Sequence, residues 1–436
     1  MGRFCLDLTA RPARRSRTGT GFRLFLLFLL LLLSVTSAES AFAQSLLPEG
    51  IVAWQAGYRS YRSQENAFDS NFQLRPIGAD YTMKFDHDML RSGKAGKDLQ
   101  RLATVLDSVG DPAETRLDLG VLKQHVTADL SASIFGLAYG ASKDLTIFAG
   151  IPWTRAQVRN RVEFSGSNNA MAILDRLGSM AFDELRAGLE QAGQLDAATI
   201  RNAIESEGYG PVDHWSYSGI GDTILGGRTA FDVELISGVP LSFEYSPSIS
   251  LPTGHADDPD LINDVGLGKG YISIAQSLTQ RARVSSNLLL GMDQMYAYNM
   301  DARMKRRVPE ENESIVAADR KTNVLYNPGD DVELGAFFEG RSGIYGARLR
   351  FADRIHYEDR YTGSIVGNYD KMSASSGTEL LTYEAGFSIN TVEAYQKKEF
   401  LLPFIANFTA SFPIAGQNSP NFEYYELTLT SFLDAR

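Results

Sequence analysis

The feature that most constrains this chain is a strict alternation of apolar and polar side chains that recurs in stretches of ten residues or more. Residues 402–412 carry an apolar residue at every second position, and residues 241–251 do the same with Ser and Glu between them. Such alternation predicts β-strands with one apolar and one polar face. Strands in soluble sheets average about 5–6 residues, whereas tilted strands that cross a bilayer need about 9–11. The lengths here therefore favour membrane-crossing strands.

The alternation predicts about thirteen strands, or fourteen if residues 120–140 form two pieces. The apolar phase slips between Ile134 and Phe135, which fits two strands or one long strand with a bulge. The candidate ranges are 51–60, 79–88, 120–134, 135–140, 144–153, 218–235, 241–252, 270–279, 284–298, 329–340, 344–358, 378–390, 400–413 and 421–433.

The connections between these strands alternate in length. The short ones lie at 141–144, 237–240, 279–281 and 340–343, and the long ones at 89–119, 154–217, 253–269, 299–328 and 359–377. Short turns on one side and long polar loops on the other are typical of bacterial transmembrane barrels. A secreted β-sandwich would also alternate, but it has no reason to sort its loops in this way. We therefore predict one all-β domain, an antiparallel up-and-down barrel of about 12–14 strands in the bacterial outer membrane.

Two of the long loops carry helical periodicity. Residues 170–206 place apolar side chains three or four apart, with Asp and Glu between, and residues 97–108 show a shorter version. We therefore predict a helical insert at about 170–206. Such an insert either caps or plugs a pore or packs on the rim of the barrel, and the sequence leaves both open.

Residues 1–43 have the layout of a secretory signal peptide. Six Arg precede an unbroken Leu/Phe run at 24–33, and Ala41-Phe42-Ala43 offers a cleavage site. The alternative is a membrane anchor, but ten helical residues span only about 15 Å. We expect a mature domain at 44–436, from which six Arg, two acidic residues and the single Cys, Cys5, have been removed. The net charge would change from −11 to −15, which argues against nucleic acid as a partner.

If the apolar face of each strand meets lipid, the other face lines the lumen. Opposed charges on that face either line a water-filled channel or pair across strands to fill a narrow barrel, and both can hold at once. The predicted pore-lining residues are Lys84, Asp86, Asp129, Asp222, Arg228, Asp232, Glu244, Glu333, Arg348, Arg350, Arg354 and Glu384.

Four short motifs follow one another in a characteristic order. Tyr139-Gly140 and a turn lead into Asp144-Leu145-Thr146, followed by Gly219-Ile220-Gly221-Asp222, Leu251-Pro252-Thr253-Gly254 and Gly266-Leu267-Gly268. This order resembles the outer-membrane β-barrel family named for the meta-pathway of phenol degradation, which is broadly similar to long-chain fatty-acid transporters. The resemblance covers about residues 135–300. Barrel proteins of the outer membrane usually end on an aromatic residue, whereas this sequence ends on Arg436.

The resemblance implies a channel or transporter for passive uptake of small solutes, often hydrophobic or aromatic, with no cofactor. Other expected partners are outer-membrane lipid and lipopolysaccharide, and the sequence leaves the oligomeric state open. One alternative is an outer-membrane lipid hydrolase, for which His214 and Ser216, with Asp213 beside them, are the only candidates. We expect no catalysis there, because the Asn that follows Ser in such enzymes is missing. A second alternative is a non-transporting surface protein that binds through loops 154–217 and 299–328.

Two charged loops have competing interpretations. Asp257, Asp258, Asp260 and Asp264 crowd carboxylates, but their spacing matches no EF-hand, so a simple acidic loop is favoured over a calcium site. The basic run at 303–307 is either a solvated loop, our default, or a contact for lipopolysaccharide phosphates. The five His show no metal-ligand spacing, and we predict no metal site.

Overall fold

The computed structural model describes residues 46–434, apart from 78, 80–81, 93–96, 110, 112–113, 237–238 and 311–314. The predicted signal peptide lies outside the described residues. Among the described residues, no helix combines the length and apolar character needed to cross a bilayer.

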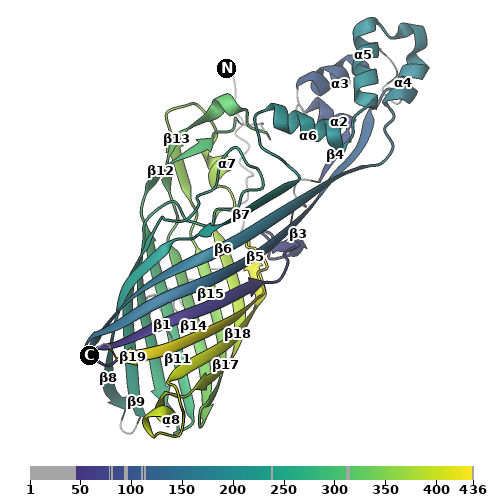
Figure 1. The fold of residues 1–436 in the computed structure, drawn as a ribbon. Helices are drawn as coiled ribbons and strands as arrows, with labels where there is room; N and C mark the ends of the chain where they lie inside the picture. The colour runs from purple at the N-terminus through teal and green to yellow at the C-terminus, as the bar shows by residue number, and fades with distance from the viewer. Residues whose placement is uncertain are drawn as a thin grey trace, which may run out of the picture.

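Twelve antiparallel strands close into a barrel, because β5 pairs with β6 as well as with β1 (Figure 1). Each strand lies beside its neighbours in the chain, and the last pairs with the first from Ile51 opposite Asp434 to Tyr61 opposite Tyr424. The predicted all-β, up-and-down barrel is confirmed. Its strands are β1 (Ile51–Tyr61), β5 (Asp118–Ser142), β6 (Leu145–Ser165), β8 (Thr223–Ile236), β9 (Val239–Leu251), β10 (Ser273–Arg283), β11 (Leu288–Asn299), β14 (Asp331–Ser342), β15 (Tyr345–His356), β17 (Thr378–Asn390), β18 (Phe404–Gln417) and β19 (Tyr424–Asp434).

The two ends of the barrel differ as the loop lengths predict. One end, the turn end, carries the beginning of β1, the end of β19 and short turns such as 143–144 and 343–344. An exception at this end is segment 391–403, which contains α8 (Val392–Gln396). The other end, the loop end, carries the long connections. They contain β2 (Asn66–Phe68), β3 (Leu74–Pro76), β4 (Met83–Asp86), α2 (His87–Arg91), α3 (Lys97–Val109), α4 (Ala170–Leu177), η3 (Gly178–Met180), α5 (Asp183–Gly193), α6 (Ala197–Ser206), β7 (His214–Ile220), β12 (Ala302–Arg307), η4 (Ala318–Arg320), β13 (Lys321–Asn327), β16 (Arg360–Gly363) and α7 (Tyr369–Ser373).

Large apolar side chains cover the outside of the barrel. Phe135, Leu349 and Leu427 are 57%, 52% and 58% exposed, although each lies in the middle of a paired strand. Their sequence neighbours point to the interior, as the two-residue period of a strand requires. These outward side chains form a continuous apolar belt. A soluble protein does not expose apolar surface of this extent to water, so the belt is the lipid-facing surface of a transmembrane barrel.

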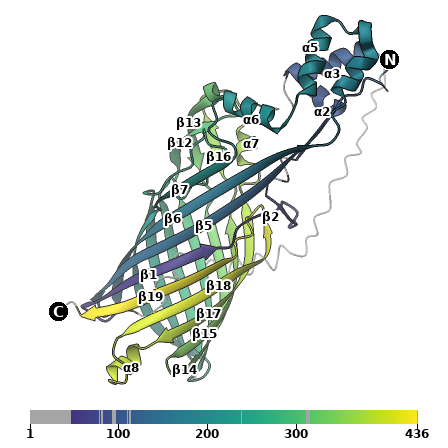
Figure 2. The same cartoon turned by 45° about the vertical axis from the view of Figure 1, so that its right-hand side comes forward.

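Strands β5 and β6 are far longer than the wall that they help to build. They pair without interruption from Val121 opposite Ser165 to Gly140 opposite Thr146, whereas β1 accompanies β5 only up to Ser131. The excess forms an arm that leaves the loop end at a slant, with β7 paired along β6 at its base and β4 paired along β5 at its tip (Figures 1 and 2). Residues 154–165, predicted as loop, are therefore strand. The alternation continues there, but with its polar side chains on the other face.

That exchange of faces explains the slip at residues 134–135. Phe135 and Leu137 point outward to lipid, whereas Ala128 and Leu130, nearer the loop end, point the other way and pack near Trp215 of β7. The register with β6 is regular across the slip, so β5 contains no bulge there and is one strand. The apolar face switches because the same strand passes from lipid into water.

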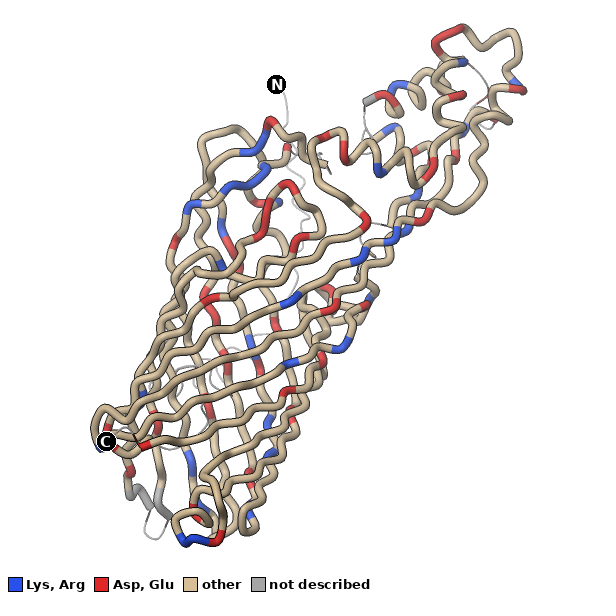
Figure 3. The backbone as a smooth tube through the Cα atoms, viewed as in Figure 1, with Lys and Arg blue, Asp and Glu red and all other residues tan. Residues whose placement is uncertain are grey.

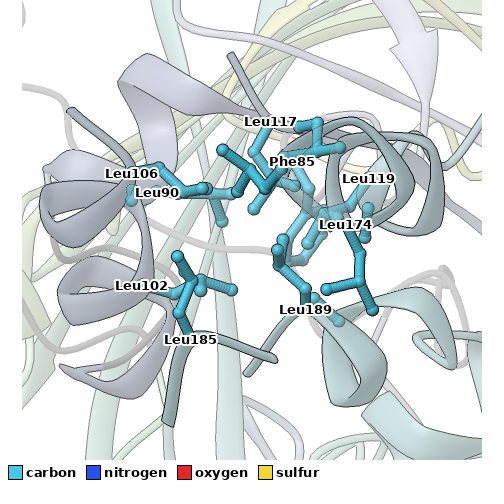
Figure 4. Packing of buried hydrophobic residues seen from close by; sticks show 14 of the residues in the cluster. Phe85, Leu90, Leu102, Leu106, Leu117, Leu119, Leu174, Leu185 and Leu189 are labelled. Atoms are coloured by element: carbon cyan, nitrogen blue, oxygen red, sulfur yellow. The ribbon is translucent and has the colours of Figure 1, made fainter. Parts of the chain in front are cut away.

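The tip of the arm carries a helical unit with its own hydrophobic core. Helices α2, α3, α4 and α5 pack there on β4, β5 and β6 around side chains such as Leu90, Leu106, Leu174 and Leu189 (Figure 4). All four leucines are at most 5% exposed. The helical insert is confirmed as part of the fold. However, the unit neither plugs the barrel nor packs on its rim, because the arm holds it away from the wall (Figures 1 and 2).

Candidate functional site

The interior wall of the barrel carries a network of ion pairs centred on Arg350 of β15. Its Nε lies 2.9 Å from Asp293 Oδ2, and its guanidinium also pairs with Glu333 and, at 3.2 Å, with Glu384. Arg354 contacts the second oxygen of Glu333 at 2.7 Å. The site thus joins residues of β11, β14, β15 and β17, all on the face opposite the lipid belt.

Small side chains on the intervening strand let this network form. Arg350 and Asp293 belong to strands that are separated by β14, and Gly335 of β14 lies between them. A Cβ at Gly335 would lie 2.5 Å from Asp293 Oδ2 and 2.9 Å from the Arg350 guanidinium. The glycine therefore provides the space in which the two charged groups meet across a strand.

Arg348 lies one step nearer the turn end. Its guanidinium is 4.0 Å from the centre of the Phe337 ring and 3.6 Å from the carboxylate of Asp293. The ring and the carboxylate hold this cation by a cation–π contact and by charge. Arg348 and Arg350 thus share Asp293, and two arginines lie on one stretch of interior wall.

A cavity of about 460 Å³ opens below these arginines at the turn end. The wall residues that line it include Arg348, Arg350, Glu384 and Asn407. Lys397, which follows α8 in segment 391–403, also lines it but is not part of a barrel strand. Cations, anions and an amide thus face one space. Such a surface favours solutes that offer both hydrogen-bond acceptors and donors.

A second group of charges lies on the opposite part of the wall. Glu244 of β9 is 3.1 Å from Arg228 of β8 and 2.9 Å from Arg281 of β10, and both Glu244 and Arg228 are 4% exposed. Nearer the turn end, Asp232 accepts a hydrogen bond from Ser242 at 2.6 Å. These carboxylates and guanidinium groups face the interior of the barrel.

A third pair faces the interior from β1 and β19. Arg59 Nε lies 2.5 Å from Glu426, and the Arg59 guanidinium is 4.5 Å from the centre of the Tyr424 ring. The Tyr424 hydroxyl donates to Glu384 at 3.2 Å, which connects this pair to the Arg350 network. The polar network therefore follows the wall over half of the barrel's strands.

Of the twelve predicted pore-lining residues, eight lie on the inner face of a barrel strand and four do not. Lys84 and Asp86 lie on β4 in the helical unit and pair with each other at 3.4 Å. Asp129 shares the outward face of β5 with Phe135 and pairs with Arg159 of β6 at 2.6 Å. The prediction was wrong for these three because it gave every polar face to the lumen, and the polar face of the arm is the outward one.

Asp222, the fourth, ties the motifs of the resemblance together at the loop end. Its carboxylate accepts hydrogen bonds from the backbone N–H of Gly254 at 3.0 Å and of Lys269 at 2.7 Å. A Cβ at Gly268 would lie 2.7 Å from the same carboxylate. The Gly-Asp, Thr-Gly and Gly-Leu-Gly motifs therefore meet in space, and the carboxylate of Asp222 joins them.

Sequence reasoning missed Asp293, Arg281, Arg59 and Glu426. The alternation could have predicted the inward position of Asp293. The outward apolar series occupies 288, 290 and 292, and Asp293 lies in the opposite phase. The alternation predicts a strand that ends at 279, with Arg281 in the turn that follows, whereas β10 continues to Arg283. The two residues of an ion pair can be as far as 367 positions apart in the sequence, as Arg59 and Glu426 are, so no local pattern predicts which residues pair.

The charged loops pair with each other. Arg306 lies 2.8 Å from Asp257, and Arg307 lies 2.8 Å from Asp260. Hydrogen bonds from Lys321 and Arg307 hold the pKa of Asp260 below its usual value. The acidic loop is therefore a counterpart of the basic run. Within the described residues, no group of three or more His, Cys, Asp and Glu is arranged to hold a metal ion.

The hydrolase candidates lie on β7, outside the barrel interior. His214 Nδ1 is 2.7 Å from Asp213, but within the described structure no hydrogen bond joins His214 to Ser216. The two residues are two positions apart on one face of the strand, and Trp215 between them is buried on the other face. A nucleophile and its base need a direct hydrogen bond, which these positions do not make.

No protein-family model matches the chain, and no curated protein matches it. Among solved structures it is similar to an outer-membrane channel from Pseudomonas putida F1, with 9% identity, 92% of this chain and 100% of that chain covered, and a TM-score of 0.49. It is also similar to the toluene transporter TodX of Pseudomonas putida (8%, 92% and 95%, 0.31) and to the translocator domain of the autotransporter NalP of Neisseria meningitidis (8%, 95% and 97%, 0.33). All three are barrel proteins of differing function, so we draw no function from the likeness.

Proposed function

We propose that the chain is a channel of the bacterial outer membrane that lets small solutes diffuse through its polar interior. One observation carries the proposal. A closed barrel with a lipid-facing belt contains a network of charged residues on its inner wall, and a cavity of about 460 Å³ lies next to Arg348 and Arg350. Paired charges would also fill a closed barrel, so the cavity beside the two arginines is what favours a channel.

The proposed direction of solute movement is toward the turn end. Bacterial barrels place short turns in the periplasm and long loops outside the cell. The cavity beneath Arg350 would then face the periplasm, and the Arg350 network would form the polar constriction above it. Diffusion down a gradient requires no cofactor.

The proposed class of solute, small hydrophobic or aromatic compounds, is supported by the motif resemblance. Aromatic acids fit the inner wall best, because they combine a ring with an anion. The ring would stack on a guanidinium group in the way that Phe337 stacks on Arg348, and the carboxylate would pair with an arginine.

Conductance across planar bilayers tests the proposal. The full chain should conduct, and Arg348→Ala with Arg350→Ala should shift the reversal potential toward cation selectivity, because two interior cations are lost. The matched control is Lys143→Ala, since this exposed lysine pairs with Asp144 at 3.7 Å in the turn after β5 and does not line the cavity. A barrel without measurable conductance or solute-induced liposome swelling would overturn the proposal.

The helical unit supports a second candidate, a surface protein that binds a partner outside the cell. A barrel needs no separately packed helices on an arm in order to conduct. The same bilayer measurement separates the two candidates, since a surface protein would form a closed barrel. Deleting residues 170–206 should leave the conductance of a channel intact.

A further inference from the structure

The outward face of β6 changes character abruptly at Trp153. From Leu145 to Trp153, its outward side chains are apolar or aromatic, and Ile147 and Trp153 are 47% and 49% exposed. The next outward residue is Arg155, and every outward residue after it up to Glu163 is charged or polar. An aromatic side chain followed by a basic one is the pattern of a barrel surface at the level of the lipid headgroups.

Hydroxyl groups flank Arg155 on both sides. In the sheet register it lies between Ser131 of β5 and Ser218 of β7. The Trp153 indole N–H donates to the Ser218 hydroxyl at 3.2 Å, which places this serine at the same boundary. The face thus presents one guanidinium group and two hydroxyls directly beyond the last lipid-facing ring.

Arg155 is distinct from the other arginines of the arm. Arg159 pairs with Asp129 at 2.6 Å, and Arg161 pairs with Glu163 at 3.0 Å. Arg155 is exposed, and among the described residues its side chain makes no hydrogen bond or ion pair. Figure 3 shows basic positions along this arm, although the chain as a whole carries a net charge of −11. A free cation at the lipid boundary of an acidic protein indicates an anionic partner in the membrane itself.

We propose that Arg155, with Ser131 and Ser218, binds a phosphate group of a phosphorylated glycolipid in the outer leaflet. The guanidinium fork matches two phosphate oxygens, and the hydroxyls donate to the third. The apolar belt below Trp153 would lie along the acyl chains of the same lipid molecule. This contact on the apolar side distinguishes a lipid from free phosphate. The proposal rests on the outer-membrane location proposed above, and not on transport.

Native mass spectrometry of the full chain in detergent micelles tests the proposal, with bis-phosphorylated lipid A as the probe. Wild-type protein should retain the lipid, and Arg155→Ala should bind it about tenfold more weakly. Arg155→Lys, which keeps the charge, should retain most of the binding. Arg283→Ala is the matched control, because this arginine is also exposed but lies at the turn end. Heat-modified gel migration confirms that each variant is folded.

Two comparisons identify the source of the phosphate. Lipid A without its phosphates should bind like the Arg155→Ala variant, and millimolar inorganic phosphate should compete poorly with intact lipid A. Equal binding of both lipids, or unchanged binding by Arg155→Ala, would overturn the proposal, and so would saturation of the site by inorganic phosphate alone. The conductance measurement is independent of all these outcomes.

Discussion

At the scale of single residues, Arg350 is the most consequential side chain. It is 9% exposed and faces three carboxylates, those of Asp293, Glu333 and Glu384. A buried cation is stable in such a place only because its partners compensate the loss of water. The same geometry makes the carboxylates depend on Arg350, since removal of the cation would leave like charges close together.

Arg350→Ala is therefore expected to destabilise the barrel by about 3–5 kcal/mol, the usual cost of breaking a buried ion pair. The measurement is the free energy of unfolding in urea with the protein in lipid bilayers. Arg341→Ala, at an exposed position, should cost less than about 1 kcal/mol. Equal costs for the two variants would show that the network contributes no stability.

Gly335→Ala tests the same network without removing a charge. The added Cβ would press on both Asp293 and Arg350, so the pair must separate. We expect a loss of stability of about 1–3 kcal/mol. Gly343→Ala is unsuitable as a control because of its positive φ, whereas Gly340→Ala adds a Cβ with no atom closer than 4.0 Å. Equal effects at 335 and 340 would contradict the proposed role of Gly335.

At the scale of elements, the helical unit and the barrel have separate cores. Leu106 and Leu189 are fully buried among the helices, and the cluster to which they belong contains no wall residue beyond the distal part of β5 and β6. Leu189→Ala should therefore cost about 2–5 kcal/mol within the helical unit alone. Hydrogen exchange should rise in residues 170–193 and stay unchanged in β14 and β15. A matching rise in those wall strands would show that the two cores are coupled.

The paired loops at the loop end predict a dependence on pH. Lys321 and Arg307 lower the folded-state pKa of Asp260 below its unfolded value of about 3.9. This contribution to stability is thus complete above pH 4 and is lost as the pH falls through the folded-state pKa. The rate of hydrogen exchange in residues 257–260 and 305–308, relative to that of an unfolded chain at the same pH, should increase below about pH 4. In Asp260→Asn, exchange should be higher at neutral pH and should lose most of this dependence.

How far the sequence predicts each element depends on its surroundings. Strand 378–390 was predicted to the residue, because lipid on one side and a polar interior on the other maintain the alternation from end to end. Residues 154–165 were missed because strand β6 leaves the lipid there, and its apolar residues move to the other face. The partners of Arg350 were also beyond reach, since they are set by the register of four strands and by the space at Gly335.

At the scale of the whole molecule, the position of the bilayer follows from residues on a single strand. On β6, the lipid-facing series ends at Trp153, and the outward face then carries Arg155, Gln157 and Arg159. A membrane boundary between Trp153 and Arg155 also accounts for the change of face on β5. The arm and its helical unit would then lie entirely outside the hydrocarbon, where helices with solvated charges are stable.

A pair of arginine substitutions on β6 tests this boundary. Ile147→Arg would put a cation in the lipid belt, at a cost on the order of 2–4 kcal/mol in the unfolding free energy. Gln157→Arg, on the same face ten residues along, should cost close to nothing, since water and Asp129 of β5 surround that position. Unfolding in urea from lipid bilayers measures both. Similar costs would place position 157 in lipid, so that the arm would lie in the membrane and not above it. Arg155 would then be buried in the hydrocarbon, where it could not meet a headgroup phosphate.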